Sequence, residues 1–190
     1  MRKLILSMNT TIDGIVTDEL SWMKPDTDQT WDSFFKMLST VDLLLLGRGM
    51  WNDYSKYWKE VLSKKEGFNK NEIKYAEFAQ QTKHLVFSST LQETSWKNAR
   101  IVTGDLKQVI QQIKLENGKD IQIVGGAEFA SGVINNGLVD EYRIMLNPVV
   151  LGRGTSLYGN LLSSLSLECF KVEHMDNGVV ILYYKYFKNT

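Results

Sequence analysis

The chain has 190 residues, and its 22 basic and 22 acidic side chains give a formal net charge of zero. This length suits one domain with an adequate hydrophobic core, so we predict a single domain over residues 1–190. The balanced charge argues against nucleic acid as the main partner, because nucleic-acid recognition leaves a basic surface. No apolar run approaches the roughly 18 residues of a membrane span, and the N-terminus lacks the pattern of a signal peptide.

Cysteine and histidine are scarce in this chain, which holds only Cys169, His84 and His174. A single cysteine excludes an internal disulfide and indicates a reducing compartment. A zinc site would need mostly carboxylate ligands, so we expect no metal site. Composition therefore predicts a cytoplasmic globular protein whose partner is a small molecule, without a nucleic-acid or membrane partner.

Strands and helices are expected to alternate along most of the chain. Apolar or alternating runs bounded by turn residues predict strands at residues 3–7 (continuing over 10–16), 41–46, 84–87, 99–103, 121–124, 140–150, 167–175 and 179–187. Helix-compatible segments fall at residues 30–38, 50–62, 73–81, 106–115 and 127–136. We expect Asp28 or Thr30 to cap the first helix and Asp105 to cap the helix at 106–115, and we expect residues 20–28 and 63–71 to form loops.

These elements predict an α/β fold, with about four helices between the first six strands. The central sheet is expected to have about eight strands and to be mainly parallel. The three residues Asp176-Asn177-Gly178 lie between the last two strands and predict a β-hairpin, which makes the C-terminal edge antiparallel.

Three strand ends carry residues suited to binding an anion. Gly47-Arg48 follows the strand at 41–46, and Ser88-Ser89-Thr90 follows the strand at 84–87. Gly125-Gly126 stands between the strand at 121–124 and a helix, whose first N–H groups and dipole favour a phosphate. The carboxyl ends of parallel strands share one edge of a sheet, where open α/β sheets bind ligands. The three junctions together therefore predict a phosphate-bearing ligand, although no G-x-G-x-x-G fingerprint follows the first strand.

The chain resembles the dihydrofolate reductase-like family, and more closely the C-terminal reductase domain of bacterial bifunctional riboflavin-biosynthesis deaminase-reductases. The resemblance covers nearly the whole chain and rests on an ordered set of motifs. These motifs are LSMNTTIDG (6–14), LLLGR (44–48), SSTL (88–91) followed by Trp96, IVGGA (123–127), GLVDEYR (137–143) and PVVLGRG (148–154).

The resemblance implies a three-layer reductase fold that binds NADPH. It places cofactor-binding residues at Asn9, Gly14, Gly47, Arg48, Ser88, Ser89, Gly125, Gly126, Ala127 and Glu128. Met8 and Asp13 would lie at the nicotinamide end with Asn9 and Gly14, whereas Arg48 and the serines would favour the 2′-phosphate of NADPH. The chain has no deaminase half, so it would be a stand-alone reductase, and the likeness also suggests a homodimer.

The chain departs from the family at two places, the loop after Gly47-Arg48 and the position of the acidic residue on the first helix. Met50 stands two residues after the Gly-Arg arginine, where the family often has threonine. Asp32 lies near the place of the acidic residue that protonates the pterin in dihydrofolate reductases, and an ordered water is the alternative proton source. Trp22, Asp28 and Arg153 are candidates for binding the substrate. An ordinary surface position is the alternative for Arg153, and core packing is the alternative for the nearby Trp31.

The first functional hypothesis is an NADPH-dependent reductase of C=N or C=O in a small flat heterocycle, of pyrimidine or pterin type. The substrate of riboflavin biosynthesis, 5-amino-6-(5-phosphoribosylamino)uracil, is one example of this class. A second hypothesis is a nucleotide-binding or ligand-sensing protein without turnover. A third is a structural member of the family with a degenerate site. Oxidation of NADPH by any flat acceptor would distinguish the first hypothesis from the others.

Overall fold

The structure is a computed structural model that describes residues 1–16 and 20–186. Its strands form one eight-stranded sheet in the order β4-β3-β2-β5-β1-β6-β8-β7. The first six strands in this order pair in parallel. The strand β8 pairs antiparallel with β6, and β7 pairs antiparallel with β8 at the edge of the sheet. The predicted α/β fold with an antiparallel C-terminal hairpin is therefore confirmed.

The strands are β1 (Leu4–Thr11), β2 (Val41–Gly47), β3 (Lys83–Phe87), β4 (Ala99–Val102), β5 (Asp120–Gly125), β6 (Glu141–Asn147), β7 (Leu167–His174) and β8 (Val180–Tyr186). The α-helices are α1 (Asp28–Leu38), α2 (Arg48–Lys64), α3 (Lys70–Gln81), α4 (Leu106–Leu115) and α5 (Ala127–Asn135). A 3₁₀ turn, η1 (Leu20–Trp22), precedes α1. None of the helices in the described part of the chain is long and apolar enough to cross a membrane.

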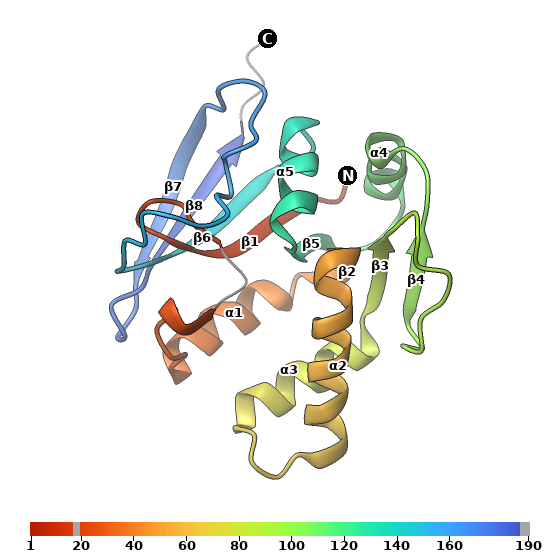
Figure 1. Cartoon of the computed structure of the whole chain (residues 1–190), viewed down its shortest axis with the longest axis horizontal. Coiled ribbons are helices and arrows are strands. Elements are labelled where there is room, and N and C mark those ends of the chain that lie inside the picture. The colour runs from red at the N-terminus through yellow and green to blue at the C-terminus, as the bar shows by residue number, and fades with distance from the viewer. Residues whose placement is uncertain (17–19, 187–190) are drawn as a thin grey trace.

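Helices cover both faces of the sheet (Figure 1). On one face, α4 and α5 pack onto alternate residues of the central strands, with Leu45 and Ile123 at the centre of the core. On the other face, α1, α2 and α3 pack onto the intervening residues, such as Leu44 and Leu46. The central strands are apolar on both faces because both faces are covered, which explains the nearly continuous leucine run in β2.

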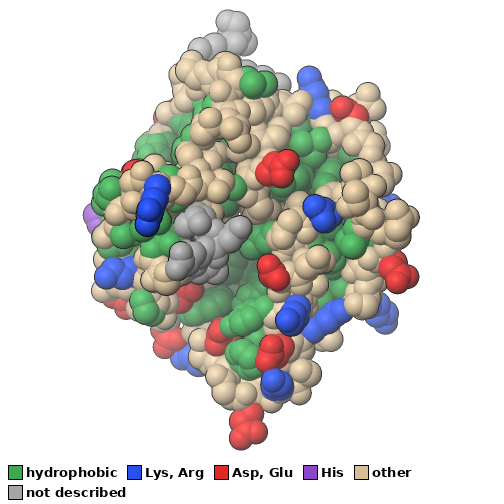
Figure 2. Space-filling view, in the orientation of Figure 1, with side chains coloured by type: hydrophobic (Ala, Val, Ile, Leu, Met, Phe, Trp, Pro, Cys, Tyr) green, Lys and Arg blue, Asp and Glu red, His purple; other side chains and the backbone are tan. Residues whose placement is uncertain are grey.

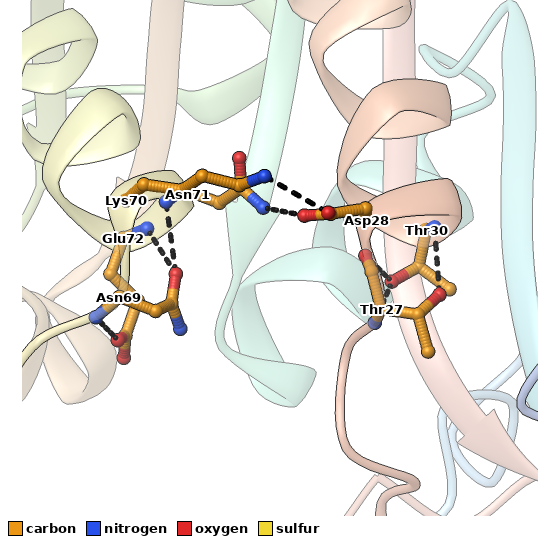
Figure 3. Close-up of polar contacts among 7 residues, drawn as sticks. All are labelled: Thr27, Asp28, Thr30, Asn69, Lys70, Asn71 and Glu72. Atoms are coloured by element: carbon orange, nitrogen blue, oxygen red, sulfur yellow. Dashed lines mark hydrogen bonds and ion pairs between the residues drawn. The ribbon is translucent and has the colours of Figure 1, made fainter.

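The starts of α1 and α3 are fixed by side-chain caps (Figure 3). Thr27 caps α1, because its hydroxyl accepts a hydrogen bond from the Thr30 backbone while the Thr30 hydroxyl accepts one from the Thr27 backbone. Asn69 and Glu72 form the same reciprocal arrangement at α3. The expectation that Asp28 or Thr30 caps α1 was therefore wrong by one to three residues, since a capping residue must precede the first helical turn.

Several predicted boundaries also shift. Five α-helices are described rather than about four, and they fall at the five segments that the sequence marked as compatible with a helix. The helix α3 begins at Lys70, inside the polar stretch that we expected to be a loop, because the Asn69 cap initiates it there. The helix α2 begins at Arg48, directly after the last residue of β2. Phe187, the predicted end of the last strand, lies outside the described residues.

Candidate functional site

The three predicted anion-binding junctions lie side by side. The strands β3, β2 and β5 are neighbours in the sheet and run parallel. Gly47 at the end of β2 pairs with Phe87, and Leu46 pairs with Gly125. The loop at Ser88, the start of α2 and the Gly125-Gly126 junction therefore share one edge of the sheet, as the sequence predicted.

Two helices start at this edge without side-chain caps. The cap positions of α2 and α5 are Gly47 and Gly126, and neither helix has a side-chain hydrogen bond to its first turn. The other three helices are capped by side-chain oxygens, from Thr27, Asn69 and Asp105. The first N–H groups of α2 and α5 therefore lack the side-chain partners that the other helices provide, and helix N-termini of this kind attract anions.

The glycines at this edge permit the two helix starts to approach each other. A Cβ on Gly47 would lie 2.7 Å from the Cβ of Phe129 in α5. A Cβ on Gly125 would overlap the sulfur of Met50 in α2. Gly126 has space around it, but its φ of +91° is one that other residues rarely adopt. Packing requires the first two glycines, and backbone conformation requires the third.

The polar residues at this edge differ in how they are used. The Ser88 hydroxyl is buried and accepts hydrogen bonds from the backbone of Thr90 (3.2 Å) and Leu91 (2.9 Å), which shapes its loop. Ser89, Arg48 and Glu128 are exposed, and Ala127 is half-buried. Within the described part of the chain, the Arg48 guanidinium has no hydrogen bond or ion pair, which leaves it available to a ligand.

A cavity of about 110 Å³, which we call the α1 cavity, lies between α1 and the strands β1, β6 and β8. Its walls combine flat aromatic rings with a few polar groups. The lining residues are Asn9, Lys24, Asp26, Thr30, Trp31, Phe34, Met145, Val179 and Ile181. Asn9 lies near the carboxyl end of β1, and β1 is the direct neighbour of β5. The cavity is therefore one strand away from the Gly125-Gly126 junction. Figure 2 shows one face of the molecule, on which hydrophobic side chains gather near the centre and charged groups are spread around them.

Asp26 is the carboxylate of the α1 cavity. Although the residue as a whole is exposed, burial of its carboxyl group raises its pKa above the usual value near 3.8. A hydrogen bond from the Thr30 hydroxyl (3.0 Å) and the positive charge of Arg143 act in the opposite direction. A carboxyl group with a raised pKa in a cavity is suited to holding and transferring a proton.

The segment before α1 is fastened to two distant parts of the chain. The Lys24 backbone donates to Asn147 Oδ1 (2.9 Å) in β6. At the tip of the β7–β8 hairpin, Asn177 donates to the Pro25 carbonyl (2.9 Å), and the Thr27 hydroxyl donates to Asp176. These contacts hold the wall of the α1 cavity that contains Lys24 and Asp26.

The remaining predicted site residues lie outside the α1 cavity lining. Asp32 follows Trp31 on the exposed side of α1. Asp28 accepts hydrogen bonds from Lys70 (2.9 Å) and Asn71 (2.8 Å) and so joins the starts of α1 and α3 (Figure 3). Trp22 ends η1, and its indole N–H is buried without a partner among the described residues.

Gly14 and Arg153 belong to two loops that bind each other. Asp13 accepts hydrogen bonds from the backbone of Leu151 (3.3 Å) and Gly152 (2.7 Å). The Leu157 backbone also donates to the Gly14 carbonyl (2.9 Å). Arg153 is exposed on this pair of loops. Asp13 therefore holds the loop after β6 against the end of β1.

Sequence reasoning missed Asp26, Met145 and the buried Arg143. A signal was present in β6: Arg143, Met145 and Asn147 point to one face, and two of these three are polar, while Tyr142 and Ile144 join the core on the other face. In β1, Ser7 and Asn9 alternate with Leu6 in the same way and pair with Arg143 and Met145. Two neighbouring strands with polar residues on one face indicate a site at that face.

Comparison with known proteins agrees with this arrangement. The fold is that of the dihydrofolate reductase-like proteins. Dihydrofolate reductase from Enterococcus faecalis, solved with NADP(H), superposes on this chain with a TM-score of 0.63. The two sequences are 12% identical, and the superposition covers 98% of this chain and 97% of that one. A protein from Shewanella sp. PV-4 that is named as a candidate riboflavin biosynthesis protein superposes with a TM-score of 0.75 at 21% identity, over 99% and 100% of the two chains.

Within that fold class, the chain belongs to the RibD C-terminal domain family, whose model matches residues 2–181. It is also 30% identical over 186 residues to the uncharacterized protein YyaP of Bacillus subtilis (strain 168), covering 96% of this chain and 94% of that protein. The family resemblance inferred from the sequence motifs is therefore confirmed.

Proposed function

We propose that the protein is an NADPH-dependent reductase of C=N or C=O in a small flat heterocycle. The observation that carries the proposal is the pair of uncapped helix starts, α2 and α5, beside the exposed Arg48 and one strand away from the α1 cavity. Membership of the RibD C-terminal domain family and likeness to a reductase solved with NADP(H) support the same assignment.

The residues at the three strand ends fit a dinucleotide cofactor. The N–H groups at the starts of α2 and α5 would bind its phosphates, and the absence of side chains at Gly47, Gly125 and Gly126 lets the backbone come close. The Arg48 guanidinium can bind phosphate oxygens through two parallel hydrogen bonds, which would favour NADPH over NADH. Ser89, Ala127 and Glu128 lie at the same edge and complete the proposed cofactor site.

The α1 cavity fits the binding of the flat substrate and the supply of a proton to it. NADPH supplies a hydride when it is bound, and the protein contributes position, proton and exclusion of water. The rings of Trp31 and Phe34 would contact a flat ring, and Asn9 and Gly14 would lie toward the nicotinamide. We assign the proton to the Asp26 carboxyl group rather than to Asp32, because Asp26 lines the cavity and Asp32 faces solvent.

The proposal is tested by two variants at the strand ends. Arg48→Ala removes the guanidinium, and Gly126→Val places a side chain where the backbone has a positive φ. Both are expected to weaken NADPH binding by at least about tenfold, since hydrogen bonds to charged groups contribute about 1.5–3 kcal/mol. Unchanged NADPH affinity in both variants would contradict the proposed cofactor site. Screening pterins and pyrimidines for NADPH oxidation would then test turnover.

A further inference from the structure

Arg143 is a buried cation beneath the α1 cavity. It projects from β6 and is only 1% exposed. Burying a charged group is costly unless a countercharge compensates it. Within the described residues, however, no carboxylate lies within ion-pair distance of this guanidinium.

The acceptors around the Arg143 guanidinium are all neutral. Its Nη2 donates to the Ser33 hydroxyl (3.1 Å), and its Nε lies 3.4 Å from the Tyr183 hydroxyl. Its Nη1 lies 3.3 Å from the Ser7 hydroxyl and 2.9 Å from the Met145 sulfur. These contacts orient the guanidinium without neutralising it.

The nearest carboxylate in this network, Glu173, is shared with another cation. Its Oε2 accepts hydrogen bonds from Ser33 (2.9 Å) and Tyr183 (2.5 Å), so it reaches Arg143 only through those hydroxyls. Its Oε1 forms an ion pair with Lys171 at 2.6 Å. One carboxylate therefore serves two cations, and the network retains a net positive charge.

This positive charge lies directly against the α1 cavity. Met145 contacts the guanidinium through its sulfur and also lines the cavity. Phe34 lies on the cavity wall, and its ring centre is 5.7 Å from the guanidinium carbon. Met145 therefore stands between Nη1 and the cavity, and methionine is a side chain flexible enough to turn aside for a ligand. Lys24, on the same segment as Asp26, adds a second positive charge to the cavity lining.

We propose that Arg143 makes the α1 cavity selective for flat ligands that carry a negative charge, such as a ring carboxylate or an ionised ring amide, over neutral ligands of the same shape. Such a ligand would place a negative charge in direct contact with the guanidinium, which Asp26 and Glu173 do not, since neither is within ion-pair distance of it. The inference deepens the proposed function, since it names the charge of the acceptor, but it requires only the cavity and not the cofactor.

Benzoate and benzamide form a matched pair of probes, because they share a shape and differ in charge. Their dissociation constants for the wild-type protein would be measured by calorimetry or by NMR titration of the Trp31 indole signal. We expect benzoate to bind at least about tenfold more tightly, as a hydrogen bond to a charged group would predict. The proposal would be overturned if benzamide bound as tightly as benzoate, or if benzoate did not bind at all.

Three variants test the residue assignment. Arg143→Met should abolish the preference for benzoate, whereas Lys185→Met, which removes an exposed cation outside this network, should keep it. Asp26→Asn should tighten benzoate binding, because Asp26 is the one acidic residue among the described residues that line the cavity. Preference for benzoate that persists in a folded Arg143→Met would overturn the proposal. If thermal unfolding shows that Arg143→Met does not fold, the proposal is still tested by the affinities of the wild-type protein for benzoate and benzamide, and by the affinity of Asp26→Asn for benzoate.

NADPH titration of the same wild-type sample separates this inference from the proposed function. NADPH binding without a preference for benzoate would contradict only the charge selectivity of the α1 cavity. Preference for benzoate without NADPH binding would support the selectivity and contradict only the proposed cofactor.

Discussion

Asn147 in β6 donates a hydrogen bond from Nδ2 to Asn9 Oδ1 in β1, at 3.0 Å. This bond fixes the orientation of the Asn9 amide, whose NH₂ group can then donate to a ligand of the α1 cavity. The same Asn147 accepts a hydrogen bond from the Lys24 backbone (2.9 Å) through its Oδ1. One fully buried amide therefore orients a cavity residue and holds the cavity wall.

Asn147→Leu should loosen both of these contacts. The substitution leaves the Lys24 N–H and the Asn9 carbonyl without their partner, and we expect it to lower the free energy of unfolding by about 2–3 kcal/mol. Urea denaturation would measure the loss, and hydrogen exchange would show faster exchange at the Lys24 amide. A variant with wild-type stability and wild-type exchange at Lys24 would show that Asn147 does not hold the wall.

Gly47→Ala should destabilise the protein, whereas Gly49→Ala should not. A Cβ on Gly47 would lie 2.7 Å from the Phe129 Cβ, but a Cβ on Gly49 meets nothing within 4 Å. We expect Gly47→Ala to cost about 1–3 kcal/mol through overpacking, and Gly49→Ala to be neutral or to add up to about 1 kcal/mol as a better helix former. Equal effects of the two substitutions on the urea midpoint would contradict the close packing of α2 and α5.

We expect low pH to decrease the free energy of unfolding, because His84 is buried in its neutral form. Its Nδ1 donates to the Thr82 carbonyl (2.9 Å), and its Nε2 accepts from the buried Tyr54 hydroxyl (3.1 Å). Burial lowers the pKa of His84 from 6.5 to about 4. As pH falls below 6.5, His84 becomes protonated in the unfolded chain but stays neutral in the folded protein. The free energy of unfolding therefore decreases between pH 6.5 and pH 4, by about 3 kcal/mol in total.

The pH dependence is checked by urea unfolding between pH 7.5 and 4. In His84→Gln the contribution of this group should disappear, and the loss of stability over this range should be smaller than in the wild type. His174→Gln is a matched control because His174 is exposed. Identical pH profiles for the wild type and His84→Gln would show that His84 is not held neutral in the folded protein.

Asp26 should matter for turnover, and Asp32 should not. If Asp26 supplies the proton, Asp26→Asn should slow NADPH-dependent reduction by about 10²-fold without changing NADPH affinity. In the wild type, the rate should fall as pH rises through the raised pKa of Asp26, because the protonated form is the donor. Asp32→Asn provides the control, and an equal loss in both variants would remove the distinction between the two carboxylates.

The sequence predicted the framework well because the framework depends on local patterns. The helix at 106–115 and its Asp105 cap were placed as observed, because an amphipathic stripe follows a capping residue. The buried β5 and the Asp176-Asn177-Gly178 hairpin carry equally local signals. The shared edge of the three strand ends followed from parallel pairing alone.

The α1 cavity could not be predicted, because it depends on contacts between distant segments. Asn9, Asp26, Met145 and Ile181 come from four separate parts of the chain. Asp32 and Trp31 are adjacent in sequence, yet one helical step of about 100° separates a solvent-facing carboxylate from a cavity-lining ring. Arg143 was missed because arginine is rarely buried without a paired carboxylate.

The most direct test of the proposed function is the affinity of the purified protein for NADPH and for NADH, followed by quenching of its five tryptophans. If α2, α5 and Arg48 form a dinucleotide site, NADPH should bind with micromolar affinity and NADH more weakly. Absence of binding by either nucleotide would leave the fold and the α1 cavity unchanged, but it would contradict the assignment of this protein as an NADPH-dependent reductase.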